Sequence, residues 1–312
     1  MKAAWSVSLR RRPFVASLAA ATTIAIAGRA AAQVSVADHA GRMVEIRDTS
    51  RVIAVGGSVT EIIYALDAGG RLVGADTTSL YPEAATRLPR VGYMRQISAE
   101  GVLSLRPTLI ISTTAAGPAA AFDQLRSAGV PTLVLADDYD IDSVLRKIEG
   151  IGHALGRDEA ARTLIAARRA EMADLAGKLA AIGGRPKVLS LLSVSQGPPQ
   201  AAGRITAAEG IIRLAGGVNA ITSYEGYRPI TAEGALALAP DALMVAAQTL
   251  EALGGFDGLL GAASLALTPA GKARRVFALD ALLLLGFGPR TPEAARRLAD
   301  FLHPGHGPAQ AP

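Results

Sequence analysis

One tyrosine stands where a side chain could bind a ligand. Tyr81 precedes Pro82 in the polar stretch ADTTSLYPEAA, directly after the apolar run 72–75. Such a run predicts a buried strand, and the loop at its end projects side chains away from the scaffold. An amphipathic tyrosine can simply cover a loop, or its phenolate can be an axial ligand of ferric iron. A phenol with a reference pKa of about 10 ionises at neutral pH only beside a metal or another cation.

A repeat within the chain places arginine and tyrosine at matching positions. The stretch GYMRQISAEGVLSLRP begins at residue 92 and GYRPITAEGALALAP begins at residue 226. Once Met94 is omitted, ten of their residues are identical. The identical pairs include Tyr93 with Tyr227, Arg95 with Arg228, and Glu100 with Glu233.

A second repeat matches two expected helix starts. SVTEIIYALDAGG from Ser58 resembles TAAEGIIRLAGG from Thr206, and a glutamate follows three residues later in each, at Glu61 and Glu209. In such a capping box, the hydroxyl and the carboxylate accept hydrogen bonds from free backbone N–H groups at the start of a helix. The sequence therefore predicts one capped helix of this kind in each half of the chain.

The two halves flank a long amphipathic helix. Residues 158–182 contain no proline, and Gly183, Gly184 and Pro186 end the helix. Its large apolar residues recur at helical spacing, at Leu164, Ile165, Met172, Leu175, Leu179 and Ile182. Repeats indicate architecture, and two copies are too few for a solenoid. We therefore expect two similar lobes joined by one rigid helix, with a ligand cleft between the lobes.

Strands and helices alternate in both halves. Apolar and β-branched runs predict strands at 51–55, 72–75, 108–112 and 132–136, and then at 187–192, 242–246 and 275–279. This alternation predicts an α/β fold with a mainly parallel sheet flanked by helices in each lobe, with ligands at the carboxyl ends of the strands. The expected segments are a signal peptide at 1–32, an N-terminal lobe at 33–156, a connecting helix at 157–183, a C-terminal lobe at 184–302 and a disordered tail at 303–312.

Composition and motifs exclude several classes of protein. None of the 312 residues is cysteine, so disulfides, thiolate metal sites and a cysteine nucleophile are ruled out. The net charge of +5 equals the five basic residues among the first 32, so we infer no nucleic-acid partner. Hydrolase, zinc-peptidase and nucleotide-loop motifs are absent, and the four histidines do not cluster with acidic residues at ligand spacing. We therefore expect the chain not to be an enzyme.

The N-terminus has the features of a secretory signal peptide. Basic residues precede an apolar run at 14–27, and the triplet AAA at 30–32 provides a cleavage site. The run is too short and too rich in small residues for a stable membrane span, an uncleaved anchor being the alternative. RRPFV at 11–15 resembles a twin-arginine signal, which leaves Sec and Tat export both open. Because no cysteine follows, we expect a periplasmic protein without a lipid anchor.

The motifs together resemble one family. VIAVGGSVTEIIYALDAGGRLVGADTTSLYP, LPRVGYMRQISAEGVLSLRPTLI, QAAGRITAAEGIIRLAGGVNA, SYEGYRPITAEGALALAPDAL and LLLLGFGPR follow in order over nearly all of the chain after the leader. They are similar to the periplasmic haem-binding proteins of bacterial ABC haem importers. This resemblance implies a two-lobed receptor that holds haem in its cleft through Tyr81. The implied partners are an inner-membrane ABC permease with its ATPase and an outer-membrane haem receptor system.

Haem offers further contacts to the repeated residues. Its two propionates suit arginine as a bidentate donor, so Arg95 and Arg228 are expected to pair with propionates or with the Tyr81 phenolate. The alternative for both arginines is an ordinary surface salt bridge. The tyrosines that could stack on the porphyrin face, or instead fill a core or surface position, are Tyr93, Tyr224 and Tyr227.

Two further expectations come from the resemblance. One exposed glutamate of each lobe docks on permease arginines in this family, and Glu61 and Glu209 are the matching positions; a helix cap does not prevent that role. Some relatives take up a second haem with a histidine in the first strand and loop of the second lobe. LLSVSQGPP has none there, with Val194 at the corresponding place. This favours one haem with a single protein ligand, although a stacked pair stays open.

Two other functions stay open. A receptor for another metal chelate, such as a siderophore or cobalamin, would share the architecture, and a tyrosine-ligated haem spectrum would separate the two. A periplasmic enzyme that modifies haem is the other alternative. The lack of an acid–base cluster or redox motif weighs against it, and unchanged porphyrin after incubation would exclude it.

Overall fold

The computed structural model describes Met1, residues 33–193 and residues 199–305. Residues Gln33–Pro312 form one compact unit, distinct from Met1–Ala32. The expected signal peptide and Val194 lie outside the described residues. Within the described part of the chain, no helix combines the length and apolar character needed to cross a membrane.

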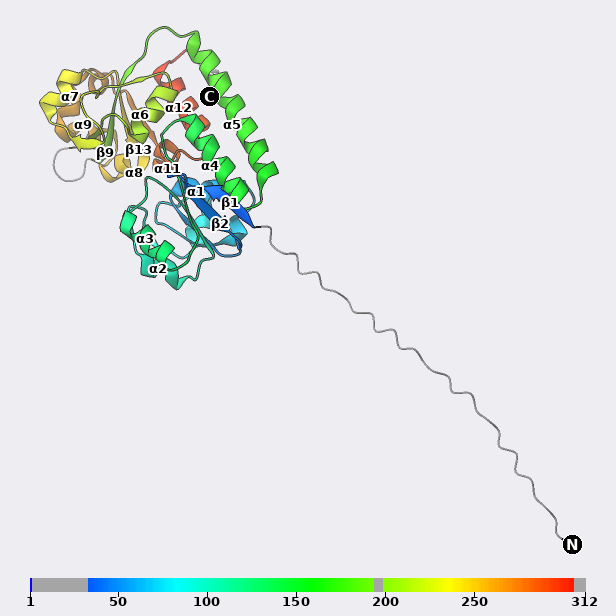
Figure 1. Cartoon of the computed structure of the whole chain (residues 1–312). Coiled ribbons are helices and arrows are strands. Elements are labelled where there is room, and N and C mark those ends of the chain that lie inside the picture. The colour runs from blue at the N-terminus through cyan, green and yellow to red at the C-terminus, as the bar shows by residue number, and fades with distance from the viewer. Residues whose placement is uncertain (2–32, 194–198, 306–312) are drawn as a thin grey trace. The chain divides into compact units, whose positions relative to one another are not determined.

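The N-terminal lobe is built on a four-stranded parallel sheet in the order β4-β3-β7-β8 (Figure 1). β3 (Val52–Val55), β7 (Leu109–Thr113) and β8 (Thr132–Leu135) are fully buried, as expected of apolar parallel strands between layers of helices. β4 (Leu72–Ala75) lies at one edge of the sheet and β8 at the other. The helices are α1 (Gly57–Ala65), α2 (Ala99–Ser104), α3 (Ala119–Ser127) and α4 (Ile141–Ala154). The hairpins are β1 (Val34–Ala37) with β2 (Met43–Ile46), and β5 (Gly92–Tyr93) with β6 (Gln96–Ile97).

The C-terminal lobe contains a mixed sheet that is parallel at its centre. β9 (Lys187–Ser193), β13 (Ala242–Ala246) and β14 (Val276–Leu279) run parallel, and the short β11 (Val218–Asn219) pairs with the start of β9. β10 (Gln200–Ala202) and β12 (Tyr227–Pro229) extend this sheet in antiparallel fashion, which the sequence did not reveal. The helices are α6 (Ala207–Leu214), α7 (Ala232–Leu238), α8 (Ala247–Ala252), α9 (Phe256–Gly261), α10 (Pro269–Lys272), α11 (Ala281–Leu285) and α12 (Thr291–Leu302).

One helix, α5 (Asp158–Ala180), connects the lobes and ends just before Gly183, as predicted. Figure 1 shows it running along the outside of the unit. It packs on α4 and α12, and Arg296 of α12 pairs with Asp174 of α5 at 3.0 Å. The apolar stripe is the face that the helix turns to the core, with Leu175 buried and Leu164, Ile165, Met172 and Leu179 partly buried. The predicted connecting helix is therefore confirmed.

The two lobes share a hydrophobic core. One cluster of buried side chains contains members from α1, α4 and α5 together with members from α6, α11 and α12. Tyr139 of the N-terminal lobe contacts Phe287 of the C-terminal lobe edge to face, with 5.5 Å between ring centroids. At Gly210 of α6, a Cβ would lie 2.3 Å from the carbonyl oxygen of Tyr139. Because packed cores do not deform continuously, only small changes in lobe orientation are expected.

Candidate functional site

A cavity of about 350 Å³ lies where the carboxyl ends of strands from both lobes meet. From the N-terminal lobe it is lined by residues that follow β3, β4, β7 and β8, and from the C-terminal lobe by the end of β9 and by α11. This is the location that the parallel sheets predict for a ligand. Of the tyrosines and arginines singled out in the sequence, the cavity is lined by Tyr93, Arg95 and Tyr227.

The loop that carries Tyr81 is organised around a buried carboxylate. Asp76 directly follows β4 and is fully buried. Its two oxygens accept hydrogen bonds from the backbone N–H groups of Gly56 and Thr78, both at 2.8 Å, and from the Ser79 hydroxyl at 2.7 Å. Arg90 donates to the carbonyl oxygens of Asp76 and Ser79 at 2.8 and 3.1 Å. These bonds hold the loop rigidly up to the residue before Leu80, which lines the cavity.

Tyr81 itself lies beside the cavity rather than in its lining. Its side chain is 45% exposed, and the guanidinium carbon of Arg290 lies 3.6 Å from the centroid of its ring. Arg290 is held in turn by Glu61, with 2.8 Å between Nη2 and Oε2. Burial alone would lower the pKa of Arg290, but its hydrogen bond and ion pair with Glu61 outweigh that effect and raise it. No role was predicted for Arg290, although the residue ends the motif LLLLGFGPR.

The docking expectation for Glu61 is wrong. The residue is 4% exposed and its carboxylate is occupied by Arg290 inside the protein, so it does not present a charge to a partner. The capping box at this helix is wrong as well, because α1 begins at Gly57 and its cap residue, Gly56, makes no side-chain cap bond. Gly56 has φ 115°, a conformation that suits glycine. Glu61 is consequently displaced into the helix and away from its start.

At the matching helix in the other lobe the capping expectation is largely confirmed. The Thr206 hydroxyl accepts from the backbone N–H of Glu209 at 3.1 Å. The Glu209 carboxylate accepts from the backbone N–H of Ile205 at 2.7 Å, one residue before the cap. Glu209 is half-buried. The two glutamates therefore occupy different environments despite their matching sequence.

Arg95 reaches the cavity because it lies in a tight turn. Tyr93 pairs with Gln96 across the β5–β6 hairpin, which leaves Met94 and Arg95 as a two-residue turn. Both turn residues and Tyr93 line the cavity. Tyr93 is 43% exposed, so its ring is available to a ligand. Arg95 is the only basic side chain among the described residues that line this cavity.

The matching residues of the C-terminal lobe are arranged differently. Arg228 is exposed and lies over the ring of Tyr224, with its guanidinium carbon 5.0 Å from the centroid, so it does not line the cavity. The Tyr224 hydroxyl donates to the carbonyl of Ala201 at 3.2 Å, and burial raises the pKa of this phenol. Tyr227 lines the cavity; burial and the nearby Tyr139 raise its pKa to about 12. Tyr227 is therefore a neutral wall of the site at physiological pH.

Two cavity-lining residues after β8 were missed in the sequence. Burial raises the pKa of the Tyr139 phenol, and the neighbouring Asp137 carboxylate adds to the shift. Asp137 pairs with Lys147 of α4 at 2.6 Å, and the two side chains are 6% and 0% exposed. Lysine is rarely buried, so its position on a helix gave no signal of this pair. The position of Asp137 and Tyr139 after a predicted strand was the available signal.

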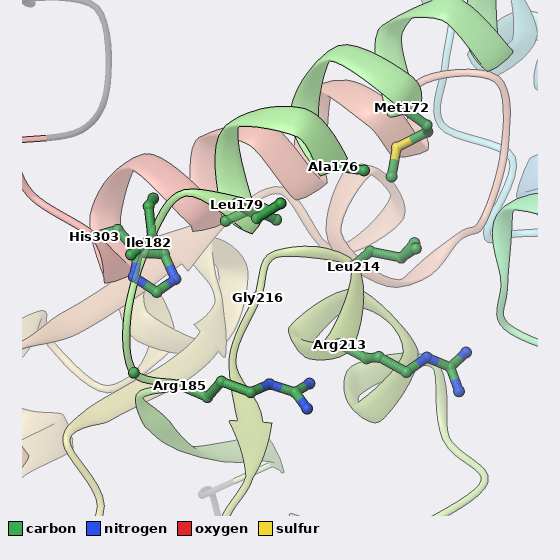
Figure 2. Close-up of a pocket in the computed structure, with 11 residues that line it drawn as sticks. Met172, Ala176, Leu179, Ile182, Arg185, Arg213, Leu214, Gly216 and His303 are labelled. Atoms are coloured by element: carbon green, nitrogen blue, oxygen red, sulfur yellow. The ribbon is translucent and has the colours of Figure 1, made fainter.

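A larger hollow of about 410 Å³ lies between α5 and the end of α6 (Figure 2). Apolar side chains such as Met172 and Leu179 line it, with Arg185 and Arg213 on one side. Arg185 already donates to the carbonyl of Gly217 at 3.0 Å, and Arg213 to that of Tyr139 at 3.4 Å. His303, expected to open a disordered tail, is 7% exposed and packs in this hollow. The hollow adjoins residues that precede β9 and β11, whereas the interlobe cavity lies at the carboxyl ends of the strands, where parallel sheets bind ligands, and we therefore place the site in the interlobe cavity.

Exposed glutamates of the first repeat occupy equivalent places in the two lobes. Glu100 lies in the first turn of α2, which Ser98 caps, and Glu233 lies in the first turn of α7, which Thr231 caps. Both are exposed. In Figure 1, α2 and α7 both lie on the side of the unit away from α5. Glu100 and Glu233 therefore have similar structural environments, whereas Glu61 and Glu209 do not.

The donor set for a metal is limited. Within the described residues, no three His, Asp or Glu side chains gather where they could hold a metal ion. A tyrosine phenolate such as that of Tyr81 is one of the protein groups that can complete the coordination of a chelated iron.

Comparison with known proteins defines the class. A family described as periplasmic binding protein matches residues 52–283, which is most of the chain. The chain therefore belongs to this family. Its two-lobed α/β architecture and interlobe cavity agree with that assignment.

Individual relatives are more specific. The periplasmic heme-binding protein RhuT from Roseiflexus sp. RS-1, solved in apo form, is 41% identical, with a TM-score of 0.77 over 82% of this chain and 100% of that chain. The periplasmic heme-binding protein BhuT, solved in complex with two hemes, is 43% identical, with a TM-score of 0.75 over 81% of this chain and 99% of that chain. An uncharacterized ABC transporter substrate-binding lipoprotein, YvrC of Bacillus subtilis, is 28% identical over 87% of this chain and 86% of its own length.

Proposed function

We propose that this periplasmic binding protein binds haem in the interlobe cavity and delivers it to an inner-membrane ABC importer. The observation that carries the proposal is the likeness to RhuT and BhuT, at 41% and 43% identity over almost their entire lengths. Neither chelation nor delivery breaks a covalent bond, so the protein acts as a receptor and not as an enzyme.

The cavity residues suit the parts of haem. Tyr81 supplies the phenolate that completes the coordination of ferric iron. Arg95, in its hairpin turn, is placed to pair with a propionate as a bidentate donor. Tyr93 and Tyr227 offer aromatic faces from opposite lobes. Arg228 lies outside the lining in this structure, so its contact with a propionate requires its side chain to leave the Tyr224 ring.

A haemin titration followed by absorbance tests the proposal. The mature protein is expected to saturate near one equivalent and to show a high-spin ferric spectrum with a tyrosinate charge-transfer band. Tyr81→Phe keeps the ring and removes the oxygen, so the band should disappear; Tyr64→Phe, a tyrosine of α1 outside the cavity lining, serves as the matched control.

The outcomes separate the parts of the proposal. If Tyr81→Phe still binds haemin with an unchanged charge-transfer band, the protein binds haem as proposed but Tyr81 is not the iron ligand. Saturation at two equivalents would correct the expected stoichiometry, since BhuT was solved with two hemes. No saturable binding of haemin by the wild-type protein would reject the haem assignment in favour of another chelate, such as a siderophore or cobalamin.

Docking on the permease involves Glu100 and Glu233 in this proposal, in place of Glu61. Three observations support this pair: both side chains are exposed, both lie in the first turn of a capped helix, and each lobe supplies one of them. Charge reversal to lysine at either position should lower haem-stimulated ATPase activity of the importer in proteoliposomes while haemin affinity stays unchanged. Glu209→Lys tests the earlier assignment beside them, and normal activity in both Glu100→Lys and Glu233→Lys would reject the new pair.

The proposed location is the periplasm, reached through a signal peptide cleaved before Gln33, without a lipid anchor. The support is the family and the absence of cysteine from the sequence. Mass spectrometry of the exported protein tests it: an N-terminus at residue 33 without added lipid mass is expected, and a retained leader would contradict the proposal.

A further inference from the structure

A single side chain of one lobe contacts both Tyr81 and Glu61 of the other. Arg290 lies between α11 and α12, with its guanidinium carbon 3.6 Å from the centroid of the Tyr81 ring. The same group donates from Nε to Oε1 of Glu61 at 3.0 Å and from Nη2 to Oε2 at 2.8 Å. The backbone N–H of Arg290 donates to Oε1 as well, at 3.2 Å.

This pair is fixed more firmly than an ordinary surface ion pair. The side chains of Arg290 and Glu61 are 20% and 5% exposed. A bidentate pair between a planar guanidinium and a carboxylate constrains orientation as well as distance. Space beside it is limited, because a Cβ on Gly288 would lie 3.3 Å from the carboxyl carbon of Glu61. Glu61 therefore sets the plane of the guanidinium against which the half-exposed Tyr81 ring lies.

We propose that Arg290 is a positioning residue for Tyr81: it supports the ring from the opposite lobe, while Glu61 holds Arg290 in place. This inference rests on the proposed function, in which Tyr81 binds the haem iron. Because the ring and its support belong to different lobes, any motion that separates the lobes withdraws Arg290 from Tyr81. Retention of haem is therefore linked to the relative orientation of the lobes through this one contact.

The rate of haem loss measures the contact. Haem-loaded protein is mixed with an excess of apomyoglobin, and transfer is followed by absorbance. Arg290→Gln should lose haem about tenfold faster, which corresponds to a cation–π contact in a partly desolvated site, with a shifted or weaker tyrosinate band. Glu61→Gln should lose haem about threefold faster, because Arg290 remains but is held less firmly. The double variant should be no faster than Arg290→Gln, since the two residues act as one unit.

Two further variants separate positioning from general stability. Arg290→Lys keeps the charge but lacks the planar fork, so its rate should lie between those of the wild type and Arg290→Gln. Arg274→Gln removes an exposed ion pair with Asp257 outside the cavity and should leave the rate unchanged. In the haem-free protein, amide hydrogen exchange in peptides covering 76–82 should be faster in Arg290→Gln and unchanged in Arg274→Gln.

The results distinguish this inference from the proposed function. If Tyr81→Phe loses the band but Arg290→Gln leaves band, rate and exchange unaltered, the inference is overturned and the function stands. If Tyr81→Phe keeps the band, the ligand assignment fails, and the exchange measurement still decides whether Arg290 supports the loop. Should Arg290→Gln not fold, Arg290→Lys carries the same test, and a wild-type rate and exchange in it would reject the inference.

Discussion

The two copies of the first repeat have nearly the same sequence but different surroundings. In the N-terminal lobe, β5 and β6 form a separate hairpin whose turn directs Arg95 into the cavity. In the C-terminal lobe, β12 pairs with β10 and becomes part of the main sheet, and Arg228 lies over Tyr224 outside the cavity. The inserted residue Met94 provides the extra turn position. Arg95, in the copy with the inserted residue, therefore lies in a turn that faces the cavity, whereas the matching Arg228 lies in a strand of the main sheet.

Buried charge also differs between the lobes. The N-terminal lobe contains the buried carboxylates of Asp76 and Glu61 and the buried pair Asp137–Lys147, of which Asp137 lines the cavity. The C-terminal lobe contributes a mainly aromatic and aliphatic wall, with the charged pair Arg204–Glu225 left exposed. The lobes thus share an architecture while they differ in the charged side chains that they bury. The following substitutions test that contrast, in order of expected effect.

The largest effect is expected at the buried ion pair. Lys147→Met leaves the Asp137 carboxylate buried without its partner, so the free energy of unfolding should fall by about 3–5 kcal/mol. Arg204→Gln, which breaks the exposed pair of the other lobe, should change it by about 0.5 kcal/mol or less. Urea unfolding at neutral pH measures both, and equal losses would show that the contrast in buried charge has no energetic meaning.

The close contact between lobes should give the next largest effect. Gly210→Ala places a methyl group against the carbonyl of Tyr139, with Phe287 also within 2.8 Å of the new atom. The unfolding free energy should fall by about 1–3 kcal/mol. Gly177→Ala, on α5 with no atom within 4 Å, should instead stabilise the protein by about 1 kcal/mol because alanine favours helices. A stabilised Gly210→Ala protein would contradict the rigid lobe contact.

Alkaline pH should reveal the neutral wall of the C-terminal lobe. The folded protein holds the Tyr227 proton to a pKa of about 12, whereas the unfolded chain releases it near the ordinary tyrosine pKa of about 10. The stabilising contribution is thus complete below pH 10 and is lost as the pH rises through 12, up to about 3 kcal/mol. Tyr227→Phe should lose less stability than the wild type between pH 9 and pH 11 in urea unfolding. If the wild type and Tyr227→Phe lose the same unfolding free energy over this pH range, ionisation of Tyr227 does not affect stability.

The smallest expected contrast lies at the two matching helix starts. Thr206→Ala removes a cap bond from α6 and should cost about 1 kcal/mol. Ser58→Ala alters the equivalent residue of α1, which makes no cap bond there, and should cost only a few tenths of that amount. Thermal unfolding of the two variants compares them directly, and a larger effect at Ser58 would reverse the comparison.

The α/β fold and most of its parallel strands were predictable because they depend on local patterns. The runs at 72–75 and 242–246 became β4 and β13 with those bounds, and the apolar stripe of α5 packs as expected. The antiparallel strands β10 and β12 were missed because they are short and form only by pairing, β10 with β9 and β12 with β10.

Side-chain environments at the site were less predictable. Glu61 was assigned to the start of a helix because its spacing from Ser58 fits a capping box, but the helix begins two residues earlier than that box predicts, after Gly56 with its positive φ. Its partner Arg290 is 229 positions away. No local sequence pattern encodes a contact between residues so far apart. For the same reason, the sequence pointed to Tyr81 as a candidate ligand but did not point to Arg290 as its neighbour.

That separation also has a consequence for biosynthesis. A chain that emerges from its N-terminus exposes Glu61 long before Arg290 exists, by 229 residues, which at typical synthesis rates is about 10–45 s. During that interval α1 carries a carboxylate that the finished protein buries. The N-terminal lobe therefore cannot attain its final interior until the last helix of the chain has been made, and a truncation before residue 290 should leave a species recognised by chaperones and proteases.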